Sequence, residues 1–249
     1  MNGLFAINKP RGRTSVDLLN ALKKVLCDNS GLSKKKIKLG HGGTLDPLAT
    51  GVLVVGVNDG CKKLSDYIKC NKVYSSVGLL GFATDTHDSE GKVIKTGPTS
   101  HITKEMLVDL LPKFTGDLMQ IPPLYSALRM DGRRLYDYAR KGIEPPREIH
   151  ARKVKIHSLS LLDFTTEHDY RTPTSKAEEE NPHEDAQRVR DIGKELNSEA
   201  HVVELERLQQ GDFRLGVNTI EWNDCLNADN IYEVLKKYNQ TLNSKNREI

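Results

Sequence analysis

The pattern of apolar and polar positions along the chain predicts an α+β protein. Residues 52–57 form an unbroken apolar run, typical of a buried strand, whereas residues 152–162 alternate apolar with polar side chains. Apolar residues with helical spacing over residues 16–27, directly after Thr14, predict a capped helix. Further strands are expected near residues 4–7, 73–80 and 213–221, and further helices near residues 61–68, 103–114, 135–139, 189–196 and 227–240.

One acidic segment interrupts this pattern. Residues 165–187, TTEHDYRTPTSKAEEENPHEDAQ, are nearly free of aliphatic side chains, so we expect a disordered or loosely held insertion. Residues 1–164 and 188–240 are then expected to form one catalytic domain. The polar tail at residues 241–249 is expected to be frayed.

Composition is that of an ordinary globular intracellular protein. No apolar run approaches the length of about 18 residues that a membrane span needs, and the first expected strand begins almost at Met1, which leaves no room for a signal or transit peptide. The four cysteines show no metal-ligand spacing, which predicts reduced thiols. The turn at residues 88–91 lacks the acidic pattern of a calcium loop, so we expect a hairpin there and no metal.

Charge is distributed unevenly along the chain. Residues 1–160 carry 26 Lys and Arg against 15 Asp and Glu, while residues 161–249 carry 11 against 19. This asymmetry favours a surface for a polyanion in the first part, although the basic residues could also serve solubility alone. Two basic groups stand out: Lys34, Lys35, Lys36 and Lys38, and then Arg129, Arg133, Arg134, Arg140, Lys141, Arg147, Arg152, Lys153 and Lys155.

The strongest candidate for chemistry is Asp46, in the run GHGGTLDPLATGVL at residues 40–53. The glycines before it permit positive φ and close approach to a ligand, and Pro47 favours extended geometry in the preceding residues. The Gly-Lys-Ser/Thr of a phosphate-binding loop is missing, so the aspartate itself is the candidate. The alternative is an ordinary turn aspartate that bonds to its own backbone.

Several segments in order resemble the TruB-type pseudouridine synthases, most closely the fungal Pus4-like enzymes that act on the T-loop uridine of tRNA. They are MNGLFAINKPRGRTS at 1–15, GHGGTLDPLATGVL at 40–53, Lys72-Val73-Tyr74 followed by Leu80-Gly81, TDTHDSEG at 84–91 and PPLYSALRMDGRRLYDYARKG at 122–142. The resemblance is dense over residues 1–163 and looser over residues 189–222.

This resemblance implies a pseudouridine synthase fold: α+β, with a mixed, mostly antiparallel central sheet flanked by helices and loops, and an inserted arm at residues 122–142 that grips RNA. It implies an isomerase that converts the T-loop uridine of tRNA to pseudouridine on a flipped-out base. Because this isomerisation involves no net redox change or group transfer, no cofactor is expected. We expect a monomer whose partner is the T arm of tRNA, in the nucleus, cytoplasm or mitochondrion.

By resemblance, Asp46 is the nucleophile, Tyr74 stacks on the target base and assists proton removal at C5, and His41 takes the place of the flipped base. The alternatives are a loop-capping aspartate, a half-buried strand tyrosine and a turn histidine. For the lysines and for Arg129 the alternative is a solvated charge. The other expected RNA-binding residues are Gly43, Thr44, Lys9, Lys72, Tyr125, Arg129, Arg133, Arg134 and Arg140.

One segment departs from the family pattern. Family members carry Ser-x-Gly-Thr-Tyr-Ile-Arg ahead of Asp-Ile-Gly, and the arginine of that segment pairs with the catalytic aspartate. Here residues 189–194 match only the tail, and the arginine position falls on Ala186. Arg188 lies two residues further on, which on a strand shifts the side chain by roughly 6 to 7 Å. Arg188 and Arg190 are the candidates for support, and the alternative function is a tRNA-binding or folding module without turnover.

Overall fold

Two compact units make up the chain. The computed structural model describes residues 1–122, 124, 126, 128–166 and 184–245. The first unit comprises Met1–Ser76 and Leu205–Ile249, and the second comprises Val77–Glu204. Each unit has its own apolar core.

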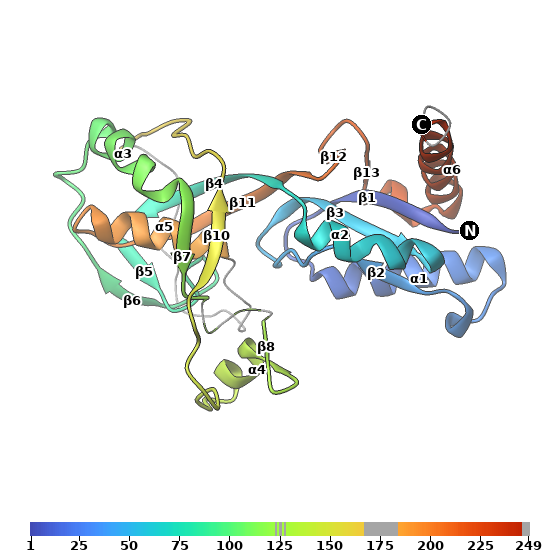
Figure 1. Ribbon diagram of the computed structural model, residues 1–249, viewed down its shortest axis with the longest axis horizontal. Coiled ribbons are helices and arrows are strands. Elements are labelled where there is room, and N and C mark those ends of the chain that lie inside the picture. Colours follow the sequence, from blue (N-terminus) through green and yellow to red (C-terminus); the bar gives the residue numbers. More distant parts are fainter. Residues whose placement is uncertain (123, 125, 127, 167–183, 246–249) are drawn as a thin grey trace. The chain divides into compact units, whose positions relative to one another are not determined.

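A mixed β-sheet forms the body of the first unit (Figure 1). Its strands are β1 (Gly3–Lys9), β2 (Leu39–His41), β3 (Thr50–Val57), β12 (Phe213–Arg214) and β13 (Thr219–Glu221), with residues of β4 (Lys72–Leu80) and β11 (Ala200–Gln210). The strand order is β12-β11-β3-β1-β13, while β2 pairs with β3 and β4 pairs with β11. The sheet is mixed, as expected: β1 is antiparallel to β3 and β12 to β11, whereas β13 is parallel to β1 and β11 is parallel to β3.

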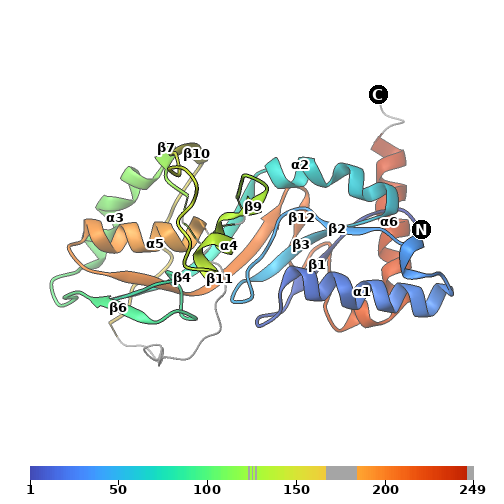
Figure 2. The same cartoon turned by 90° about the horizontal axis from the view of Figure 1, so that it is seen from below.

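The described helices of this unit are α1 (Ser15–Ser30), α2 (Leu64–Lys69) and α6 (Ala228–Lys245), with 3-10 turns at Lys34–Lys36, Asn58–Lys63 and Asp224–Leu226. Helix α6 contacts both β1 and α1 (Figure 2). As predicted, Thr14 caps α1, and Asp17 returns the hydrogen bond in a capping box. The helix ends at Gly31, which takes the left-handed conformation that glycine adopts without cost.

The core of the first unit grows from β3, whose apolar run is buried along its whole length after Thr50. One cluster joins Leu4, Val52, Val54, Leu64 and Phe213. Such a run buries apolar surface on both faces of the sheet, worth about 1.5 to 3 kcal/mol for each fully buried aliphatic side chain. The loop that carries Asp46 therefore leads directly into a strand that is buried after its first residue.

In its described residues, the second unit contains three short antiparallel pairs of strands. They are β5 (Phe82–Thr84) with β6 (Val93–Thr96), β7 (Gly116–Gln120) with β10 (Arg152–Ile156), and β8 (Arg129–Met130) with β9 (Arg133–Arg134). Its helices are α3 (Lys104–Leu110), followed by a 3-10 turn at Leu111–Phe114, α4 (Leu135–Arg140) and α5 (Glu184–Glu195). The hairpin expected around residues 88–91 is confirmed. In the part of the chain that the structure describes, no helix is long and apolar enough to cross a bilayer.

Several expected boundaries were wrong. The strand predicted over residues 152–162 ends at Ile156, and residues 213–221 form two short strands instead of one. The longest strand, β11, was missed because its charged and amide residues hide the two-residue period. The single catalytic domain over residues 1–164 and 188–240 stays a prediction. Most of the predicted insertion, and the end of the predicted tail, lie outside the described residues.

Gly51 provides a test of the packing between β3 and β11. It has φ +96°, and a Cβ there would collide with the backbone of Arg207. Gly216 also has positive φ, but a Cβ there would meet nothing within 4 Å. We expect Gly51→Ala to lower the free energy of unfolding by roughly 3 kcal/mol, from backbone strain plus overpacking, and Gly216→Ala by about 1 to 2 kcal/mol. Urea unfolding of both variants measures this, and equal losses would contradict the packing.

Candidate active site

Asp46 lies in the loop between β2 and β3, within the first unit, and keeps only 8 % of its surface exposed. The loop begins with the amide of Gly42 donating to the Val54 carbonyl at 2.8 Å. It closes with the amide of Ala49 donating to the Asp46 carbonyl at 3.0 Å. The start of the loop is thus bound to β3, and a local turn fixes the backbone at Asp46.

Two buried side chains of β11 bind the first half of this loop. Arg207 is 1 % exposed; its Nη2 donates to the Gly43 carbonyl at 3.2 Å and its Nη1 to the Thr44 carbonyl at 3.5 Å. The Nε2 of Gln210, which has no exposed surface, donates to the Gly42 carbonyl at 2.6 Å. Three consecutive carbonyls are therefore satisfied by side chains from one strand.

Two further buried side chains bind the second half. Ser15 Oγ donates to the Leu45 carbonyl at 2.9 Å and accepts from the Leu45 amide at 3.0 Å. Lys9 Nζ donates to the carbonyl of Ala49 at 2.7 Å and, more weakly, to that of Pro47 at 3.3 Å. An ammonium and a hydroxyl can be buried here because each finds backbone partners in the loop.

The expected RNA contact of Lys9 was wrong for this conformation. Lys9 has no exposed surface, and its ammonium is directed to carbonyls of Pro10, Pro47 and Ala49. A group without exposed surface cannot reach a phosphate. In this structure Lys9 neither faces solvent nor is placed to bind RNA. Its ammonium instead holds the backbone of the Asp46 loop.

The other predicted residues of the first unit surround the same loop. Tyr74, half-buried on β4, accepts a hydrogen bond from Arg207 Nη1 at 3.3 Å. His41, at the end of β2, accepts from the Gly43 amide through Nδ1 at 3.4 Å. Lys72 Cε lies 4.0 Å from the position that a Cβ on Gly43 would take. The structure thus brings Asp46, Tyr74, His41, Gly43, Thr44 and Lys72 together in one unit.

The remaining predicted residues belong to the second unit. Arg129 and Arg133 are exposed on the β8–β9 hairpin, Arg134 ends that hairpin half-buried, and Arg140 lies in α4. Tyr125 lies outside the described residues. This basic hairpin and helix coincide with the predicted RNA-gripping arm.

The helix expected near residues 189–196 is confirmed, but it begins at Glu184, within the predicted insertion, and so includes the position expected for the supporting arginine. Helix α5 includes Ala186, Arg188 and Arg190. The Arg190 guanidinium is held by the Asp191 carboxylate at 2.9 Å and by His87 Nε2 at 2.8 Å, all within the second unit. In these contacts Arg190 binds His87 and Asp191 and not Asp46.

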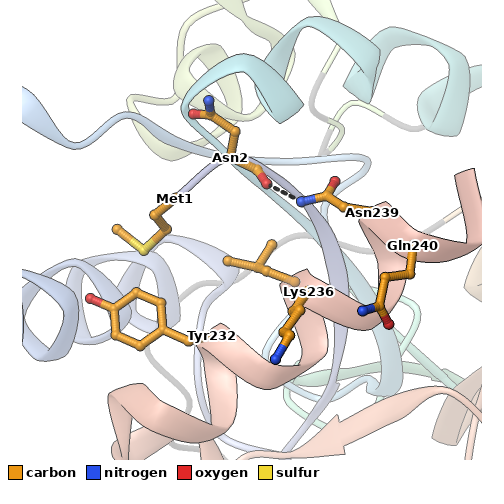
Figure 3. Close-up of a pocket in the computed structure, with 7 residues that line it drawn as sticks. Met1, Asn2, Tyr232, Lys236, Asn239 and Gln240 are labelled. Atoms are coloured by element: carbon orange, nitrogen blue, oxygen red, sulfur yellow. Dashed lines mark hydrogen bonds between the residues drawn. The ribbon is translucent and has the colours of Figure 1, made fainter. Parts of the chain in front are cut away.

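A cavity of about 490 Å³ in the first unit lies elsewhere. It is an open hollow between the start of the chain and α6, where the Asn239 amide donates to the Asn2 carbonyl at 3.0 Å (Figure 3). Its lining is Met1, Asn2, Tyr232, Leu235, Lys236, Asn239 and Gln240. None of the residues predicted for chemistry or RNA binding is among them.

Comparison with known proteins finds the same family that the Asp46 loop resembles. Residues 31–179 match the TruB family pseudouridylate synthase (N terminal domain). The mouse pseudouridylate synthase TRUB1 is 42 % identical over 245 residues, which cover 95 % of this chain and 71 % of the mouse protein. The chain belongs to the TruB family of pseudouridylate synthases. In fission yeast, tRNA pseudouridine synthase 4 is 47 % identical over 203 residues, covering 72 % of this chain and 49 % of that protein.

The match extends to bacteria and to solved structures. The tRNA pseudouridine synthase B of Fusobacterium nucleatum is 41 % identical over 219 residues, covering 86 % of this chain and 70 % of that protein. A chain of a Cbf5-Nop10-Gar1 complex matches with a TM-score of 0.59 and 21 % identity, over 93 % of this chain and 55 % of that one. The latter shows the fold alone. This TruB-family chain spans between half and about seven-tenths of the length of these relatives.

Three residues of this TruB-family site were missed from the sequence: Ser15, Arg207 and Gln210. Arg207 was detectable, because Val203, Leu205 and Arg207 alternate on one buried face of β11. Glu204 and Glu206, which lie between them, obscure that alternation in the sequence. Gln210 and Ser15 give no such signal, since their burial depends on the distant loop that they bind.

His87 generates a pH-dependent prediction for the second unit. Burial, together with the charges of Arg190 and Lys194, lowers the pKa of His87 to about 4, against an opposing effect of Asp85. Because an arginine only donates, His87 Nε2 must accept from Arg190, which excludes a proton on that nitrogen. The pKa of His87 in the folded state lies below its ordinary value of 6.5. Neutral His87 therefore stabilises the folded state fully above pH 6.5, and this contribution is lost as the pH falls toward 4.

The free energy of unfolding of wild type should fall between pH 7 and pH 4. For His87→Asn we expect a fall that is smaller by up to about 3 kcal/mol, because this titrating group is missing. Asparagine tolerates the positive φ of 66° at this position. Urea unfolding across this pH range measures the difference, with His150→Asn, at an exposed position, as control. Parallel curves for wild type and His87→Asn would contradict the assignment.

Proposed function

We propose that this chain is a tRNA pseudouridine synthase that isomerises the T-loop uridine, the position 55 type, with Asp46 as nucleophile. The observation that carries the proposal is the complete Asp46 loop, bound at both halves by buried donors and adjoining Tyr74. The names of the relatives, which are pseudouridylate and tRNA pseudouridine synthases, support the same activity.

The reaction explains why a rigid carboxylate is needed. Uridine loses its C1′–N1 bond, the base turns, and a C1′–C5 bond forms while the C5 proton leaves and N1 gains a proton, so that the product is an isomer. The target base must leave the RNA stack, at a cost of about a few kcal/mol. Asp46 then adds to the flipped nucleotide, while Tyr74 stacks on the base and assists removal of the C5 proton. His41 fills the space that the flipped base leaves in the RNA.

Phosphate contacts would offset the cost of flipping. Exposed Lys34, Lys35 and Lys36 form a 3-10 turn shortly before β2, and exposed Arg129 and Arg133 lie on the β8–β9 hairpin. We assign both groups, with Lys72, Arg134, Arg140 and Tyr125, to binding of the tRNA T arm, because clustered cations of this kind release counterions from a phosphate backbone. The protein acts as a monomer inside the cell, where its substrate is found, and the redox-neutral chemistry calls for no cofactor.

A tRNA-binding module without turnover was the alternative suggested by the departure at Ala186. The comparisons lend it no support, since the relatives carry the names of active enzymes. In addition, a buried arginine does bind the Asp46 loop of this chain, although it comes from β11. We therefore retain the enzyme as the proposed function.

Asp46→Asn tests the proposal with little change in shape. Pseudouridine formation on unmodified tRNA should fall by at least roughly 1000-fold, because the nucleophile is lost, whereas the dissociation constant for tRNA should stay within about threefold. Base mapping of the product gives the position, and filter binding gives the affinity. Asp66→Asn, at an exposed site on α2, is the matched control and should retain activity.

Two outcomes would refute the enzyme. One is the absence of any pseudouridine from wild type on intact tRNA. The other is a rate for Asp46→Asn close to that of wild type and Asp66→Asn.

A further inference from the structure

We propose that Arg207 is a positioning residue that holds the Asp46 loop and the Tyr74 phenol in one arrangement. The inference rests on the proposed function, because positioning matters only where Asp46 and Tyr74 act on a base. The arginine expected near Ala186 was to pair with the Asp46 carboxylate, whereas Arg207 of β11 acts on the backbone carbonyls of the loop and on Tyr74.

One guanidinium contacts the chain on both sides of Asp46. On the N-terminal side it donates to the Gly43 and Thr44 carbonyls, and on the C-terminal side its Nε donates to the Val52 carbonyl at 2.6 Å. The five N–H groups of an arginine lie in one rigid plane, so these acceptors cannot move independently of one another. The entrance and the exit of the loop are thereby fixed to the same group.

The same guanidinium also sets the direction of the Tyr74 hydroxyl. Nη1 lies 3.3 Å from the Tyr74 oxygen, and Cζ lies 5.9 Å from the centre of the ring. Since arginine can only donate, the phenol oxygen accepts, and the phenolic hydrogen must be directed to a different acceptor. Arg207 therefore orients both the ring and the proton of the tyrosine proposed to assist at C5.

Burial makes this arrangement stiff. Arg207 is 1 % exposed, and an ion taken out of water is tolerated only where its donors are satisfied. Any movement of the loop away from the guanidinium would leave a buried charge with open donors. A lysine at this position would keep the charge but could not reach several acceptors in one plane.

Arg207→Lys is the first test, with Arg214→Lys as control, because Arg214 is exposed on the neighbouring strand β12. With enzyme in excess over tRNA, the single-turnover rate should fall by roughly 100-fold, the scale of a 1 Å misplacement, while the dissociation constant for tRNA stays within about threefold. Arg214→Lys should match wild type. A single-turnover rate for Arg207→Lys within about threefold of wild type would overturn the proposal.

A double-mutant cycle with Tyr74→Phe separates positioning from general damage. If Arg207 acts partly through the hydroxyl, the fold-loss from Arg207→Lys should be at least about threefold smaller in the Tyr74→Phe background than in wild type. Equal losses in both backgrounds would mean that Arg207 does not orient the phenol.

Hydrogen exchange gives a readout that does not need activity. Amides of residues 42–49 should exchange at least about tenfold faster in Arg207→Lys, while those of β1 and α1 stay as in wild type. Unchanged exchange in the loop, or faster exchange throughout the first unit, would overturn the proposal. Were wild type inactive on tRNA, the proposed function would fail, and the exchange result would still decide whether Arg207 holds the loop.

Discussion

The structure around Asp46 depends on buried donors that satisfy the carbonyls of one loop. Leu45, Leu48 and Ala49 of this loop are buried in the core, so the backbone around them is also taken out of water. Its carbonyls could be taken out of water only because Arg207, Gln210, Ser15 and Lys9 supply hydrogen bonds. These donors come from β11, α1 and β1, so the loop is assembled by the tertiary fold of the first unit.

That dependence has a chemical purpose. Under the proposed function, fixing the carboxylate in the fold leaves little ordering to be done when the substrate arrives, so that binding free energy from the phosphates would serve to flip the base. The cost of burying an arginine and a lysine is offset by the apolar core around β3 and Phe213. The same fold thus supplies both the stability and the rigid site.

Local signals in the sequence predicted much of this arrangement. The capped helix at 16–27, the apolar strand at 52–57 and the hairpin around 88–91 follow from nearby residues, and so does the conspicuous Asp46 loop. What could not be predicted depends on partners far along the chain. Lys9 was expected to contact RNA or solvent but is buried against the loop, and the burial of Ser15 and Gln210 depends on the same loop. The roles of Asp46, Tyr74 and His41 stay predictions.

A crystal structure of the protein with a T-arm RNA would test the central claim most directly. The account predicts that the target uridine lies outside the RNA stack, with its base or ribose within hydrogen-bond reach of the Asp46 carboxylate and its ring against Tyr74. The loop itself should keep its contacts to Arg207 and Gln210. A uridine still stacked in the T loop, with Asp46 directed away from it, would contradict the account.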